Sequence, residues 1–145
     1  MDRSVAILIT AAAGGLIALQ APINANLGRS TGSLAAALIS FGVGTIALAI
    51  IVTLAGQTGG VGSLTEAGPV YLIGGLLGAV YVTCALIAVK SIGAGGVAAG
   101  TITGQLIASI AVDRIGAFGL DQEPLTLSRI AGVALLLVGT YLIVR

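Results

Sequence analysis

The chain has 145 residues, of which 57% are hydrophobic and 8% are charged, and its formal net charge is +1. Soluble domains carry about 25% charged residues, so this composition predicts an integral membrane protein. Histidine is absent and Cys84 is the only cysteine, which excludes disulfides within one chain, zinc sites with thiolate or imidazole ligands, and histidine-based catalysis. We therefore expect no metal, no cofactor, no nucleic-acid partner and no enzymatic activity.

The first predicted membrane helix covers about residues 4–27 and ends in a polar segment. Gln20 and Asn24 are four residues apart, so they share a helix face. Pro22 lies between them and removes one backbone hydrogen-bond donor. Amides at membrane depth indicate either a substrate cavity or a hydrogen-bond network that holds the helices together.

Two further apolar helices are predicted at about residues 33–55 and 69–89, joined by a glycine-rich surface loop. Ser40 is a polar residue within the second helix, in a row of small residues. Tyr81 lies deep in the third helix, where its hydroxyl needs a hydrogen-bond partner. Both residues are candidates for a polar cavity.

The fourth predicted helix, at about residues 93–112, contains no charge, and its roughly 20 residues would cross about 30 Å, one bilayer core. Three of its glycines recur every four residues and form one groove for a neighbouring helix: Gly96, Gly100 and Gly104. Thr101 and Gln105 recur in the same way on an adjacent face. Gln105 is therefore a candidate either for an interhelical hydrogen bond or for a substrate cavity.

The fifth predicted helix covers about residues 127–144, and its glycines Gly132 and Gly139 are seven residues apart, as in a helix-packing surface. The chain thus reads as one all-α transmembrane domain over residues 1–145, with five membrane-spanning helices. An odd number of spans places the two termini on opposite sides of the membrane.

Basic residues in short loops normally set membrane orientation, because lysine and arginine stay in the cytoplasm. With five spans, the six basic residues divide evenly, with Arg3, Arg114 and Arg129 on one side and Arg29, Lys90 and Arg145 on the other. The even count predicts dual topology, in which copies of both orientations pair as an antiparallel homodimer. The alternative is one fixed orientation with a weak bias, helped by a partner protein.

Several motifs resemble known membrane transporters. Gly132, Leu135 and Gly139 match the last helix of small multidrug resistance proteins and of EamA-type repeats. The segment from Leu19 to Arg29, LQAPINANLGR, resembles the YdcZ-like family of short five-helix inner-membrane exporters, in the drug/metabolite transporter (DMT) superfamily. So do Gly32-Ser33, Gly104-Gln105 and Pro124-Leu-Thr.

The resemblance implies a multi-pass protein of the bacterial inner (cytoplasmic) membrane. It also implies half of a ten-helix DMT-type fold, completed by an antiparallel homodimer. The multidrug proteins carry a membrane-embedded glutamate in their first helix for proton and cation exchange. No carboxylate lies between Arg3 and Arg29 here, so that mechanism is not carried over.

The leading hypothesis is an exporter of a small polar solute, working by alternating access through a cavity at the antiparallel dimer interface. The predicted substrate-binding residues are Gln20, Asn24, Ser40, Tyr81, Thr101 and Gln105. The predicted helix-packing and dimerisation residues are Gly96, Gly100, Gly104, Gly132 and Gly139. A cavity without charge suits a neutral or zwitterionic solute. The alternatives are a small dual-topology ion channel and a non-transporting membrane scaffold in which every polar group is structural.

Overall fold

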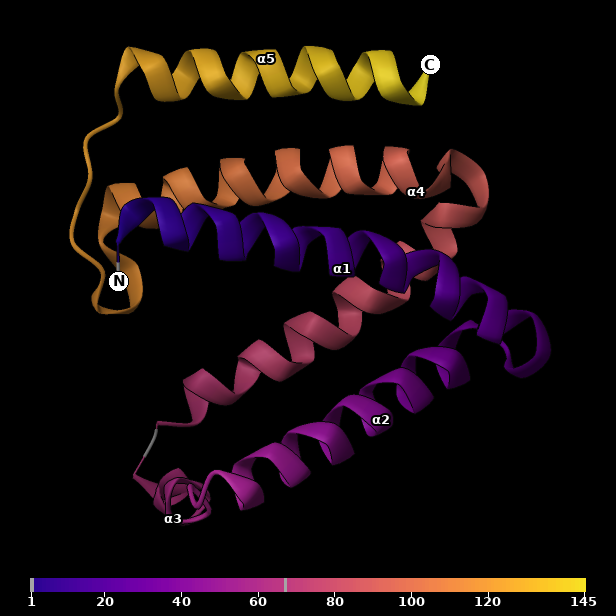
Figure 1. Cartoon of the computed structure of the whole chain (residues 1–145). Coiled ribbons are helices and arrows are strands. Elements are labelled where there is room, and N and C mark those ends of the chain that lie inside the picture. Colours follow the sequence, from indigo (N-terminus) through magenta and orange to yellow (C-terminus); the bar gives the residue numbers. More distant parts are fainter. Residues whose placement is uncertain (1, 67) are drawn as a thin grey trace. The chain divides into compact units, whose positions relative to one another are not determined.

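The computed structural model describes residues 2–66 and 68–145, and within them every regular element is helical, which confirms the prediction of an all-α chain. Figure 1 shows the α-helices along the chain. The elements in chain order are α1 (Arg3–Thr31), α2 (Ser33–Leu54), α3 (Gly59–Gly62), η1 (Ser63–Thr65), η2 (Pro69–Leu72), α4 (Ile73–Ile115), η3 (Ala117–Gly119) and α5 (Leu127–Val144).

Four helical segments are long and apolar enough to cross a membrane: Arg3–Thr31, Ser33–Leu54, Pro69–Ile115 and Leu127–Val144. The third has 47 residues, which at about 1.5 Å per residue is twice the roughly 30 Å of a hydrocarbon core. Gly93 interrupts it with non-helical backbone angles, φ 69° and ψ 173°. A residue with a side chain rarely adopts such angles, so this glycine allows the break. The two expected spans at 69–89 and 93–112 therefore lie in one element that is broken at Gly93.

Local signals explain the other helix ends. Gly32, with φ 84°, is the single residue between α1 and α2. At the start of α5, the Thr126 hydroxyl accepts a hydrogen bond from the backbone N–H of Arg129 at 3.3 Å. This side-chain cap satisfies one of the N–H groups that a helix start leaves without a partner.

The described chain divides into two compact units. We call Leu19–Lys90 the second unit, and the remainder, up to Ala18 and from Ser91 to Arg145, the first unit. The second unit contains the end of α1, all of α2 and the first part of α4. The first unit contains the start of α1, the rest of α4 and α5.

The second unit has a small apolar core where its three helices meet. Its buried members are Ala25 of α1, Ala37 of α2, and Val82 and Leu86 of α4, with Tyr81 and Val89 packed against them. Small residues allow this close approach, since a Cβ built at Gly28 would lie only 3.6 Å from the Cβ of Ala36. Such contacts between small residues are typical of helix packing in membranes.

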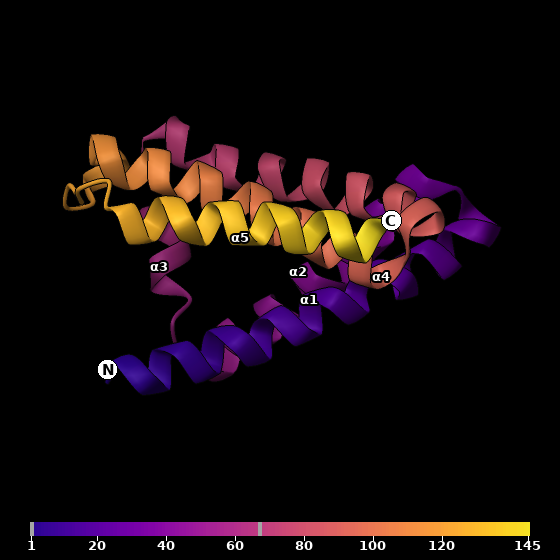
Figure 2. The ribbon, with the colours of Figure 1, turned by 90° about the horizontal axis from the view of Figure 1, so that it is seen from above.

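The first unit pairs α5 with the second part of α4, and the two helices run side by side in Figures 1 and 2. A Cβ built at Gly95 would lie 3.8 Å from Ile143 of α5, which shows how closely the helices approach there. From residue 2 to residue 17, by contrast, every side chain of the chain except half-buried Ala6 is exposed. Most large apolar residues of both units are exposed as well, as expected for helices that face lipid.

Candidate functional site

Asn24 is the most deeply buried of the predicted site residues, with 4% of its surface exposed. It lies on the face of α1 that packs inside the second unit, which also carries Ala21, Ala25 and Gly28. Its side-chain nitrogen Nδ2 has no hydrogen-bond partner among the described residues. A buried polar group without a partner loses several kcal/mol in an apolar environment, and native proteins satisfy nearly all such groups.

Ala25, the next residue in α1, belongs to the apolar core of the second unit. Tyr81, another predicted site residue, packs against this core from α4. Tyr81 is half-buried.

The remaining site residues of the second unit are more accessible. Gln20 is exposed although it precedes Asn24 by about one helical turn, and Ser40 of α2 is half-buried. In the first unit, Thr101 is half-buried and Gln105 is exposed. Because Gln20 belongs to the second unit and Gln105 to the first, the predicted meeting of these amides stays a prediction.

Thr103, which is buried, and Thr140, which is half-buried, form a polar contact that the sequence analysis missed. Their hydroxyl oxygens are 2.7 Å apart, and they lie 2.9 Å and 3.1 Å from the carbonyl oxygen of Ala99. Each hydroxyl has one proton, so one hydroxyl donates to Ala99 while the other donates to the first. This chain of hydrogen bonds joins α4 to α5. The available signal was Thr140 itself, a hydroxyl that follows the apolar run from Ala134 to Val138.

Most of the predicted packing glycines, all of which lie in the first unit, have free space where a side chain would be. A Cβ built at Gly100, Gly104, Gly132 or Gly139 would meet no heavy atom within 4 Å. Gly96 is buried, but its nearest neighbour is Ile92, four residues earlier and on the other side of the break at Gly93. The glycine groove on α4 therefore has room for a further helix, and its role in packing stays a prediction.

Arg129 of α5 forms ion pairs both with α4 and with the loop that joins α4 to α5. Its guanidinium lies 3.5 Å from a carboxylate oxygen of Asp113 and 3.5 Å from one of Glu123. Asp113 also accepts a hydrogen bond at its backbone oxygen from the N–H of Glu123 at 3.0 Å. These side chains are only about one-third to one-half exposed, so the pairs close one end of the first unit.

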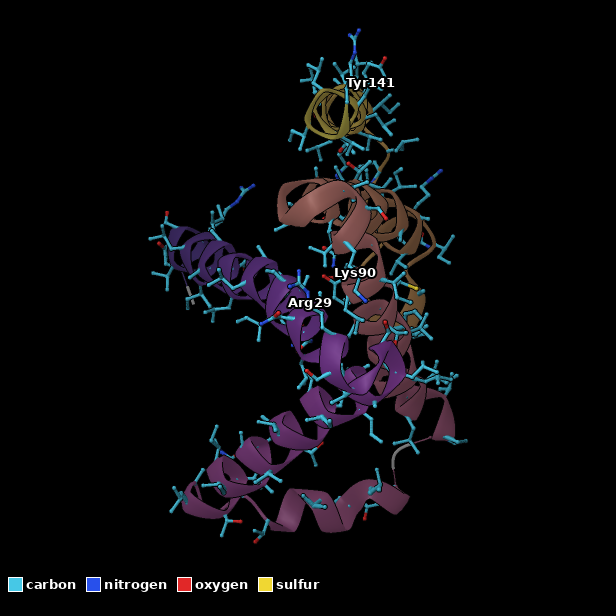
Figure 3. The ribbon with its side chains drawn as sticks, turned by 90° about the vertical axis from the view of Figure 1, so that its right-hand side faces the viewer. Arg29, Lys90 and Tyr141 are labelled. Atoms are coloured by element: carbon cyan, nitrogen blue, oxygen red, sulfur yellow. The ribbon has the colours of Figure 1, made fainter. Side chains whose placement is uncertain are left out.

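An open apolar groove of about 320 Å³ lies between α4 and α5. Its lining residues are Ile107, Ile110, Leu125, Ile130, Val133, Ala134 and Leu137. Further along α5, Tyr141 is exposed, as Figure 3 shows for its labelled side chain. A groove of this composition suits an acyl chain or an apolar helix and offers no group to a polar solute.

Among the described residues, no three metal-ligating side chains of the histidine, cysteine or carboxylate type lie together. The predicted substrate-binding residues carry amides and hydroxyls, and one buried donor, Asn24 Nδ2, has no partner among the described residues. Such groups can hold a polar molecule by hydrogen bonds.

The family model described as "Putative inner membrane exporter, YdcZ" matches residues 5–142, nearly the whole chain. No curated protein and no solved structure matches the chain. Together with the long apolar helices, the match makes this a protein of the inner membrane and a membrane transporter. The chain belongs to the YdcZ family of inner-membrane exporters.

Proposed function

We propose that the protein exports a small neutral or zwitterionic polar solute by alternating access, through a cavity between two antiparallel copies. Each copy crosses the membrane five times, by α1, α2, the two parts of α4 on either side of Gly93, and α5. Two such copies amount to a ten-helix fold of the DMT type. Inverted repeats of this kind, with the substrate near the bilayer midplane, are the common plan of secondary transporters.

The observation that carries the proposal is the unpartnered Nδ2 of Asn24. If Asn24 only held the helices of this chain together, its amide would hydrogen-bond to a neighbouring helix of its unit. The residue is instead 4% exposed, its Nδ2 has no partner among the described residues, and the core of its unit is apolar. A solute with a hydrogen-bond acceptor would satisfy this donor. Asn24 would then bind the solute rather than hold the helices together.

Three features support a second copy as the other wall of the cavity. Gln20 and Gln105 are exposed on long apolar helices, and an amide that faces lipid is costly. The groove at Gly100 and Gly104 has no neighbour within 4 Å. The first part of α1 is exposed on nearly all sides. A copy in the opposite orientation would cover these surfaces with polar and small residues of its own.

The test is a screen of small polar solutes for thermal stabilisation of the purified protein. A solute present at about 100 times its Kd stabilises the folded state by about 2.7 kcal/mol, a shift of several degrees. Solutes that stabilise are then measured for flux in proteoliposomes. Asn24→Ala should abolish both effects, whereas the matched control Asn26→Ala, at an exposed position of the same helix, should keep them.

The alternatives give different results in the same experiments. A carrier saturates at low turnover, whereas a channel passes ions very fast without saturation. A scaffold shows no stabilisation by any solute and no flux. If Asn24→Ala lowers stability and flux equally, while Asn26→Ala changes neither, the amide is structural and the proposal fails.

A further inference from the structure

Two basic residues belong to the junction where α1 meets α2 in the second unit. The ammonium Nζ of Lys90 donates a hydrogen bond to Ser33 Oγ at 3.4 Å. Arg29 is in the last turn of α1, four residues before Ser33, and only Gly32 separates the two helices. The neighbouring Gly28 approaches Ser33 as well, since a Cβ built there would lie 3.6 Å from the Ser33 Cα. Figure 3 shows Arg29 and Lys90 at this end of the unit.

Neither of these cations pairs with a carboxylate of the described residues. The ion pairs of the described residues are both made by Arg129, and no carboxylate lies within 4.0 Å of Arg29 or Lys90. The partner of Lys90 is a neutral hydroxyl, which leaves the positive charge uncompensated. Both side chains are exposed, so a molecule from outside the chain can reach them. The patch therefore attracts an anion.

Apolar residues begin directly beside the patch. Leu34, next to Ser33 at the start of α2, is 76% exposed, and Leu38, one turn further along, is 75% exposed. They form an apolar strip that leads away from the two cations along the helix. A free phosphate ion has no apolar part that could contact such a strip. A phospholipid matches it, because its acyl chain continues from the charged headgroup into the hydrocarbon layer.

We propose that Arg29 and Lys90 bind the phosphate of an anionic phospholipid, with Ser33 orienting the lysine and with Leu34 and Leu38 in contact with the acyl chain. Basic residues at the end of a membrane helix attract anionic lipids in this way. The proposal concerns a lipid site at the membrane surface and is independent of the substrate cavity and of the dimer.

The experiment measures binding of tail-labelled dioleoyl phosphatidylglycerol to the purified protein in neutral detergent. Unlabelled phosphatidylglycerol, phosphatidylcholine and inorganic phosphate serve as competitors. Each basic residue near an anionic surface contributes about a fivefold gain in affinity, so the pair contributes roughly 30-fold. The double variant Arg29→Gln/Lys90→Gln should weaken binding by about that factor, and each single variant by about fivefold.

The matched control is Arg3→Gln/Arg145→Gln, which removes the same charge from exposed positions elsewhere, and it should change affinity less than twofold. Circular dichroism in lipid-free detergent shows that each variant keeps its helices, and the single variants test the site even if the double variant unfolds. An equal loss in the control pair would overturn the proposal, because only net charge would then matter. Equal competition by phosphatidylcholine, or displacement by inorganic phosphate as effective as by the lipid, would overturn the assignment to an anionic lipid.

Discussion

Replacing Asn24 by leucine distinguishes a functional role of its amide from a structural one. The two roles predict opposite changes in the free energy of unfolding. The side chain is buried, and its Nδ2 has no partner among the described residues. Leaving a buried donor unsatisfied costs about 1–3 kcal/mol, and leucine has a similar size without that donor. Asn24→Leu should therefore raise the free energy of unfolding by about 1–3 kcal/mol while abolishing solute transport.

The assay is reversible unfolding in mixed micelles, followed by helical content as the fraction of denaturing detergent increases. Asn26→Leu is the matched control, because Asn26 is exposed on the same helix, and it should change stability by less than about 0.5 kcal/mol. If Asn24→Leu lowers the free energy of unfolding by 1 kcal/mol or more, the amide is hydrogen-bonded in the folded protein and the reasoning is refuted. Retained transport in a folded Asn24→Leu protein would refute the assignment to the substrate site.

The remaining predictions use the same unfolding assay or an assembly assay. Thr140→Val removes one hydroxyl of the contact with Thr103 and should cost about 1 kcal/mol, whereas Thr140→Ser should cost less; equal stability of both variants would contradict the hydrogen-bonded contact. Gly93→Ala should cost about 1–3 kcal/mol, because φ there is 69° and ψ is 173°, and an unchanged free energy of unfolding would show that the break does not need glycine. Gly100→Leu should abolish the dimer in analytical ultracentrifugation by filling the groove, while Leu106→Val should leave it intact; a normal dimer in Gly100→Leu would exclude this groove from the interface.

The apolar, membrane-spanning character of the helices and many of the helix ends were predictable, because their causes are local in the sequence. The absence of charge over residues 93–112 and the apolar run over residues 127–144 identify apolar helices from composition alone. The ends follow residues with special backbone properties, such as Gly32 with its positive φ and Pro69 at the first position of η2. Such signals act within a few residues and need no knowledge of the neighbouring helices.

The partners of individual side chains were not predictable in the same way. The four-residue spacing groups Thr101 with Gln105 on one face of the helix, but it does not say which face meets α5. The structure places Thr103, not Thr101, in the contact with Thr140. Likewise, Gln20 and Asn24 share a face by spacing, yet only Asn24 is buried. The relative rotation of two helices depends on packing over their whole length, which spacing within one helix does not contain.

The central claim is that two copies in opposite orientations complete the transport cavity, and the location of the C-terminus tests it most directly. The protein is fused after Arg145 to a reporter that fluoresces only in the cytoplasm, or to a phosphatase that is active only outside it. Three basic residues on each side give no preferred orientation, so both fusions should give a signal in cells. A signal from only one of the two fusions, at equal expression, would contradict the antiparallel pair.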